Sequence, residues 1–252
     1  MTVLCDWGLH GVRSLAPQSD AVIVVDVLSF STAVDIAVAR GAAILPYQWK
    51  DASAEAYARS KGALLAGPRG ASAGYSLSPA SLESMRAGEA LVVPSPNGST
   101  LSLAAAAITL TYCACLRNAR AVAAHVSSAA ERIALIAAGE QWEDGSLRPC
   151  TEDLVGAGAV IAGLRGRLSP EAEVAVAAFE RFRNRLYESI RDCVSGRELA
   201  ERGFERDIEL AADYAVSDAV PVFRTDRFLS NDPTRPIRSN WNNDRVMDPA
   251  RT

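Results

Sequence analysis

The chain has 252 residues, of which 49% are hydrophobic and 22% charged, and its formal net charge is −4. A chain of this size buries a core without disulfides or metals, as one large α/β domain or two modest ones. The mild acidity and the lack of a basic tract give no support to a nucleic-acid partner. The five cysteines show no CxxC spacing, and only two histidines are present, which argues against a zinc site.

The N-terminus lacks the basic-then-apolar layout of a signal peptide, and no apolar run reaches membrane-spanning length. We therefore expect a cytoplasmic protein with reduced thiols and no membrane partner.

The chain begins with a predicted short edge strand over 1–7 and a loop through Gly8 and Gly11. From residue 21 onward, short apolar runs alternate with helical patterns that end at glycine or begin at capping residues. The rhythm predicts an α/β fold, a three-layer α/β/α arrangement with a mainly parallel sheet. The strands are predicted at 21–27, 43–45, 63–66, 90–93, 109–113 and 133–137, and the helices at 30–40, 51–61, 82–86, 100–107, 118–125 and 151–164.

After Pro170 the pattern changes to four amphipathic helices, at 171–182, 185–193, 197–204 and 205–214, and then one last strand at 220–223. We predict a single domain over 1–230, in which residues 170–215 form a C-terminal helical segment packed on the sheet. Residues 231–252 contain three prolines and many polar residues, which predicts an extended tail.

Asp26 stands at the end of the most apolar predicted strand, and Ser31 and Thr32 follow where a helix begins. In an open α/β sheet, ligands bind beyond the carboxyl ends of the strands, where helix N-termini also point. An acid and hydroxyls at such a place predict a site for an anion, a metal or both. The alternative is that Asp26 and Ser31 or Thr32 only cap the helix.

Residues 95–100 and 139–153 share this layout of strand, polar turn and helix start. In Asn97-Gly98-Ser99-Thr100, Asn and Gly tolerate left-handed backbone, so successive N–H groups can converge on a phosphate. The alternative is a turn with Ser99 as N-cap. Acids at a helix start complement the helix dipole, and they also bind hard cations, so Asp26 with Glu152 or Asp153 would suit Mg²⁺. Gly156-Ala-Gly158 lies inside a helix, where small-residue packing explains it better than dinucleotide binding.

Seven short stretches carry a further signal because of their order along the chain. They are Val-Val-Asp-Val-Leu-Ser-Phe-Ser-Thr-Ala-Val (24–34), Arg-Gly-Ala (40–42), Leu-Leu-Ala-Gly-Pro-Arg-Gly (64–70), Leu-Ser-Pro (77–79), Ser-Pro-Asn-Gly-Ser-Thr (95–100), Leu-Arg-Asn-Ala (116–119) and Thr-Glu-Asp (151–153). The ordered set resembles the 2-phosphosulfolactate phosphatase family. The resemblance implies an α/β/α fold, a homodimer and a magnesium-dependent phosphatase that removes phosphate from 2-phospho-3-sulfolactate on the route to coenzyme M.

Carried over by position, the resemblance places Asp26, Asn97–Thr100, Asn118 and Glu152-Asp153 around a site for a small anionic phosphoester. Our hypothesis on mechanism has water as the attacking group, with Asp26 as an alternative nucleophile. Mg²⁺ would be held by Asp26, Glu152 and Asp153. The substrate-binding candidates are Ser31, Thr32, Arg69, Asn97, Gly98, Ser99, Thr100, Arg117 and Asn118.

Three departures from the family pattern concern this same site. Arginine is usual where this chain has Ser29, glutamate where it has Pro68, and Gly-Asn-Ser-Pro where it has Ser-Leu-Ser-Pro at 76–79. Arg69 or Arg117 would have to supply the missing cation. The alternative function is a catalytically inactive member that binds a phosphorylated metabolite as a sensor or partner protein.

Overall fold

The predicted strand before Asp26 lies in the middle of the sheet, as β2 (Ala21–Val25), and all five of its residues are buried. The computed structural model describes residues 1–71 and 74–231. Within them, ten strands form one sheet in the order β10-β1-β7-β2-β6-β11-β12-β3-β5-β4. The others are β1 (Thr2–Trp7), β3 (Ala43–Tyr47), β4 (Leu64–Leu65), β5 (Ala90–Pro94), β6 (Leu110–Ala114), β7 (Arg132–Ala137), β10 (Arg167–Leu168), β11 (Pro221–Arg224) and β12 (Arg227–Ser230).

The sheet is mostly parallel, which confirms the predicted α/β class. β2 pairs in parallel with β6 and β7, and β3 does so with β5. The exception is the antiparallel hairpin of β11 and β12, which is inserted between β6 and β3. The sequence predicted β11 but not β12, because a four-residue strand right after a tight turn carries too little pattern. β1 is not the edge strand that was predicted, since β10 pairs with its outer side.

Three helices differ clearly from the prediction. One is α10 (Val194–Glu201), which was predicted at 197–204 and begins three residues earlier, where Cys193 Sγ accepts from the Gly196 N–H as its N-cap. Helix α1 (Gly8–Leu15) occupies the stretch that was predicted as a loop, because Gly8, at φ +55°, lets the chain turn directly from β1 into the helix. Helix α4 (Pro79–Leu82) begins earlier than predicted, with Pro79 in its first turn. The remaining helices are α2 (Phe30–Ala39), α3 (Ala52–Ser60), α5 (Gly98–Ala106), α6 (Ala119–Ala129), α7 (Thr151–Ile161), α8 (Pro170–Phe182), α9 (Leu186–Asp192) and α11 (Glu205–Ala212).

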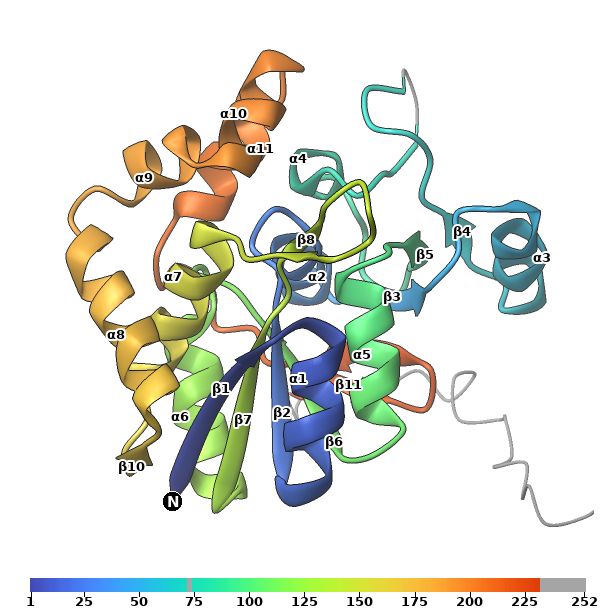
Figure 1. Cartoon of the computed structure of the whole chain (residues 1–252). Coiled ribbons are helices and arrows are strands. Elements are labelled where there is room, and N and C mark those ends of the chain that lie inside the picture. Colours follow the sequence, from blue (N-terminus) through green and yellow to red (C-terminus); the bar gives the residue numbers. More distant parts are fainter. Residues whose placement is uncertain (72–73, 232–252) are drawn as a thin grey trace, which may run out of the picture.

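The helices cover both faces of the sheet (Figure 1). Alternate residues of β2 point to opposite sides, so Ile23 and Val25 pack with α6 and α7, while Val22 and Val24 pack with α1 and α5. Helices α2 and α4 pack over β3 and β5, and α3 covers the other face of those two strands. These layers are those of a three-layer α/β/α fold.

The C-terminal helical segment packs on α7 and, through α8, on β1 of the sheet. Helix α8 runs along α7, and α11 contacts α4 and α9. Gly158 allows the close approach of α7 and α8, since a Cβ built there would lie 1.9 Å from the Ala175 carbonyl oxygen. Gly156 is similarly confined, since a Cβ added there would lie 2.5 Å from Val27 Cγ2. Both glycines therefore serve helix packing, as the sequence indicated.

Of the predicted tail over 231–252, only Asn231 lies within the described residues, and its backbone N–H donates to the Val220 carbonyl. Across residues 1–71 and 74–231, no helix is long and apolar enough to cross a membrane.

Candidate active site

The predicted site lies where the carboxyl ends of three parallel strands, β2, β6 and β7, meet. In the sheet register, Val25 at the end of β2 stands opposite Ala114 of β6 on one side and Ala137 of β7 on the other. The turns that follow these three strands are therefore neighbours. The turn after β5 reaches the same place through α5, because the Gly98 N–H donates to Asp26.

Asp26 is buried, with 6% of its surface exposed, and both of its carboxylate oxygens accept backbone hydrogen bonds. Oδ1 accepts from the Phe30 N–H at 3.2 Å, and Oδ2 accepts from the Gly98 N–H at 2.9 Å. The carboxylate thus lies between the N-termini of α2 and α5, where helix dipoles favour negative charge. Asp26 does cap a helix, as the alternative proposed, but it caps two at once and links two turns that are 72 residues apart.

Asp153 makes an equivalent link at the N-terminus of α7. Its Oδ1 accepts from the Val27 N–H at 2.7 Å, and its Oδ2 accepts from the Gly139 N–H at 2.8 Å. Glu152 precedes it and is also buried. The carboxylates of Asp26 and Asp153 therefore hold together the turns after β2 and β7 and the start of α7. The carboxylate of Glu152 lies beside them.

These carboxylates repel one another. Burial first, and then the charges of Glu140 and Glu152, raise the pKa of Asp26 to about 7. Burial first, and then the charges of Glu152 and Asp26, raise the pKa of Asp153 well above its usual range. Such clustered negative charge is relieved by protons or by a bound cation. The cluster of Asp26, Glu140, Glu152 and Asp153 is here named the acidic cluster.

In the part of the chain that the structure describes, no three His, Cys, Asp or Glu side chains are grouped so that they could enclose a metal ion by themselves. Mg²⁺ does not need such a cage, because it uses one or two carboxylates and completes its shell with waters and phosphate oxygens. The donor set of the acidic cluster fits that mode of binding.

The Asn97–Thr100 turn begins α5. Because the Gly98 N–H is used by Asp26, the amides left for a ligand are those of Ser99 and Thr100, for which no acceptor exists among the described residues. The Ser99 hydroxyl donates to the Val93 carbonyl at 2.8 Å, whereas the buried Thr100 Oγ1 has no partner among them. Asn97 and Thr100 line a cavity of about 490 Å³ together with Glu140 of the acidic cluster.

Three other candidates stabilise the turns rather than open toward a cavity. Ser31 Oγ accepts from the Asp26 N–H at 2.9 Å, and Thr32 Oγ1 donates to the Val27 carbonyl at 2.8 Å. Asn118 Oδ1 accepts from the Cys115 N–H at 2.9 Å and fixes the turn after β6. All three side chains are fully buried. They shape the backbone around Asp26.

The two candidate arginines lie in different surroundings. Arg117 is directed at α2 and α11, where it pairs with Asp35 at 3.0 Å and Asp213 at 2.8 Å, so the structure does not bring it to the acidic cluster. Arg69 instead donates from Nη2 to Ser29 Oγ at 2.8 Å, and its Nη1 forms an ion pair with Asp207. The positive charge of Arg69 is close enough to Asp26 to interact with it electrostatically.

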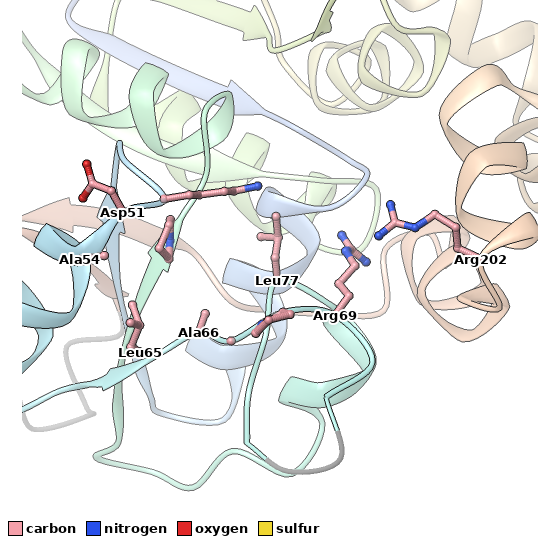
Figure 2. Close-up of a pocket in the computed structure, with 11 residues that line it drawn as sticks. Asp51, Ala54, Leu65, Ala66, Arg69, Leu77 and Arg202 are labelled. Atoms are coloured by element: carbon pink, nitrogen blue, oxygen red, sulfur yellow. The ribbon is translucent and has the colours of Figure 1, made fainter.

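Arg69 also lines a cavity of about 590 Å³ at this edge of the sheet. In Figure 2, Arg69 and Arg202 extend into the same part of the cavity, while Asp51 lies at its opposite side. Lys50 and Pro68 belong to the lining as well.

Comparisons with known proteins show the family of the chain. A family model described as 2-phosphosulpholactate phosphatase matches residues 12–226. The chain belongs to this family. A 2-phosphosulfolactate phosphatase from Methanothermobacter thermautotrophicus is 30% identical over 208 residues, which cover 81% of this chain and 87% of the relative.

Two further relatives bear the name "Probable 2-phosphosulfolactate phosphatase". The protein from Carboxydothermus hydrogenoformans is 32% identical, and the aligned part covers 81% of this chain and 86% of the relative. The protein from Pseudothermotoga lettingae is 25% identical, and the aligned part covers 86% of this chain and 95% of the relative. The resemblance noted in the sequence is thus confirmed at the level of the family.

Several residues at the site of this family member were not among the predicted ones. Glu140 lies in the turn after β7, directly after Gly139 with its φ of +67°, and a search of every strand end for acids would have found it. Asp207, Lys50 and Arg202 had no such signal. They come from α11, from the turn before α3 and from the end of α10, and only the folded chain brings them to the Asp26 edge.

Proposed function

We propose that the protein is a magnesium-dependent phosphomonoesterase that hydrolyses a small anionic 2-phospho acid of the 2-phosphosulfolactate type. The observation that carries the proposal is the juxtaposition of the acidic cluster with the N-terminus of α5. Asp26 binds the Gly98 N–H at 2.9 Å, while the Ser99 and Thr100 amides stay without an acceptor among the described residues. A phosphate placed there would meet amide donors and a helix dipole on one side and carboxylates on the other.

In this proposal, Ser99 and Thr100 orient the phosphate. Their amides would donate to its oxygens, and the unpartnered Thr100 hydroxyl would supply a further donor. Amides held at a helix start do not need to reorganise as charge builds up during phosphoryl transfer, so they stabilise the transition state at little cost. The family name of the relatives supports this choice of chemistry.

The carboxylates of Asp26 and Glu152 would hold Mg²⁺, with Asp153 as the alternative second ligand. When bound, the ion supplies Lewis-acid catalysis and offsets the negative charge of the phosphate. Asp26 and Asp153 each accept one backbone amide on each oxygen, which leaves a further lone pair on each oxygen for an ion. Glu152 is preferred as the second ligand because no backbone amide of the described residues binds its carboxylate. Water is the proposed attacking group, because backbone amides hold both Asp26 oxygens in place between α2 and α5 and the carboxylate is assigned to the ion.

The test is phosphate release from 2-phospho-3-sulfolactate and other 2-phospho acids, with magnesium and with EDTA. We expect turnover that EDTA abolishes and magnesium restores. Turnover that survives EDTA would refute the magnesium requirement, and binding without turnover on any ester would support the inactive sensor instead. The names of the relatives do not support that alternative.

The predicted homodimer and a place on the route to coenzyme M extend this proposal. Light scattering during size-exclusion chromatography would test the first, and the second follows only if 2-phospho-3-sulfolactate is the preferred ester.

A further inference from the structure

The cavity beside Arg69 has a positively charged lining. Lys50, Arg69 and Arg202 reach it from three separate segments of the chain, and Asp51 is the one acid among its lining residues. Asp51 is already engaged, because its carboxylate accepts from the Ser53 N–H at 2.9 Å as the N-cap of α3. Within residues 1–71 and 74–231, no carboxylate forms an ion pair with Lys50 or Arg202. The cavity therefore carries a surplus of positive charge.

Arg69 and Arg202 share one aromatic ring despite their like charge. The guanidinium carbon of Arg69 lies 5.6 Å from the centroid of Phe204, and that of Arg202 lies 5.5 Å from it. Burial lowers the pKa of Arg69, and the positive charge of Arg202 lowers it further. The negative charge of Asp207 acts in the opposite direction. Two guanidinium groups with like charge are thus held close together, and an anion bound between them would relieve their repulsion.

The cavity is next to the proposed phosphate site rather than remote from it. Arg69 joins the two places, because it lines the cavity and also donates to Ser29, three residues beyond Asp26. Pro94 lines the cavity at the end of β5, and the same turn leads to Gly98, which binds Asp26. A small acid with its phosphate at the α5 N-terminus would extend toward this cavity.

We propose that the cavity binds the third anionic group of the substrate, beside its phosphoester and its carboxylate. In 2-phospho-3-sulfolactate this group is the sulfonate, and Arg202 and Lys50 are the specificity-determining residues for it. This inference rests on the proposed function. Arg69 holds the group from the Asp26 side, and Arg202 closes on it from the C-terminal helical segment. That segment thus takes part in substrate selection.

Two esters that differ only in the sulfonate test the inference, namely 2-phospho-3-sulfolactate and 2-phospholactate. Each of R202A and K50A should raise KM for the sulfonated ester by about 10-fold or more, the size expected for one lost charge-assisted contact. Because the contact is present before and during the reaction, kcat should change little. On 2-phospholactate, both variants should resemble the wild type, and R202K should keep most of the affinity for the sulfonated ester.

The control is R165A, which removes one exposed arginine near the amino end of β1, at the opposite edge of the sheet. It should behave as the wild type on both esters. If R202A and K50A impair both esters equally, or neither, the inference is overturned.

Calorimetric binding of the product, 3-sulfolactate, separates this inference from the proposed function. If neither ester is hydrolysed but the wild type binds 3-sulfolactate at least about 10-fold more tightly than R202A does, the anion site stands and the phosphatase proposal fails. If the sulfonated ester is hydrolysed but R202A and K50A bind 3-sulfolactate as well as the wild type, the phosphatase proposal stands and the anion site is refuted.

Discussion

Substituting Gly98 by alanine should destabilise the protein and displace Asp26 at the same time. A Cβ built on Gly98 would lie 2.3 Å from Phe30 Cδ1 and 2.4 Å from its Cγ, and ordinary van der Waals contact begins only at 3.4 Å. The ring of Phe30 or the Gly98 peptide must therefore move by about 1 Å. Phe30 is completely buried and packs edge-on against Phe228, so the ring has little freedom to yield.

The displacement falls on the two groups that hold Asp26. Its carboxylate accepts from the N–H groups of Phe30 and Gly98, so a shift of either residue lengthens a hydrogen bond that is now 3.2 or 2.9 Å. Overpacking of this kind costs about 1–3 kcal/mol. A misplacement of about 1 Å at a catalytic group lowers the rate by about 100-fold.

Urea unfolding of the wild type and of Gly98→Ala gives the free energy, and phosphate release gives kcat under conditions where both proteins are folded. Gly67→Ala is the matched control, because its new Cβ would meet nothing closer than 3.8 Å, and it should lose no stability. Helix propensity favours alanine over glycine by about 1 kcal/mol, so it cannot account for a loss of stability. A Gly98→Ala protein that is as stable and as active as the wild type would refute the argument.

Three other substitutions test separate parts of the structure. Asp26→Asn should lower kcat by at least about 100-fold. The melting temperature should stay nearly unchanged, because the loss of one hydrogen bond from a backbone amide is offset by removal of a buried charge. A large loss of stability with full activity would show that Asp26 is purely structural. Burial raises the pKa of Asp35 from 3.8 to about 6, so the folded state binds this proton more tightly and loses stability as the pH rises through that window. The free energy of unfolding of the wild type, relative to Asp35→Asn, should therefore fall by on the order of 2–3 kcal/mol from pH 4 to pH 6, and a flat difference in urea titrations would contradict this. Gly158→Ala should cost about 3 kcal/mol or more in the same assay, because its Cβ would collide with the Ala175 carbonyl, and a neutral effect would show that α7 and α8 separate freely.

The place of the site could be predicted from the sequence because it depends on local patterns. Asp26, Asn97–Thr100 and Glu152 each stand just before a helix start, and the parallel strands β2 and β7 bring the turns that follow them to one edge. Parallel pairing does not place the turn after β5, because the β11–β12 hairpin reverses β3 and β5 relative to β6; the start of α5 brings that turn to Asp26. What the pattern could not show is how the groups divide the work. The Gly98 amide, which was predicted to bind phosphate, binds Asp26 instead, and this leaves the next two amides for a ligand. Such a division depends on distances within the folded site.

The sequence named two candidate arginines, Arg69 and Arg117, but could not show which of them lies at the site, and the reason is a different one. Arg117 follows a strand in the expected manner, yet buried Asp35 of α2 holds its guanidinium away from Asp26. Arg69 is held at the site by Asp207 of α11, which forms an ion pair with it across 138 positions of the chain. No local periodicity reports a contact of that separation. Helix α1 was missed for the opposite reason, because Gly8 suggested a loop but in fact only starts the helix.

The position of Arg69 changes what the serine at position 29 means for the charge of the site. The resemblance noted in the sequence implies arginine at this position, and a serine there would by itself remove a cation from an anion-binding site. In the folded chain, the Arg69 guanidinium lies 2.8 Å from Ser29 Oγ, so a positive charge is present beside position 29 even though the residue itself is neutral.

Asp207 anchors that guanidinium, and Asp207 is itself fixed by the Ser78 hydroxyl and by the Ala80 N–H at 3.1 Å. Ser78 agrees with the pattern that the resemblance implies, and the departing residues are Ser76 and Leu77 just before it. The Ser76 hydroxyl accepts from the Ser78 N–H at 3.1 Å, and Leu77 lines the cavity beside Arg69. Pro68 precedes Arg69 directly. The three departures therefore surround one ion pair. A change at any one of them alters how Arg69 is held, so the positive charge beside position 29 depends on all three.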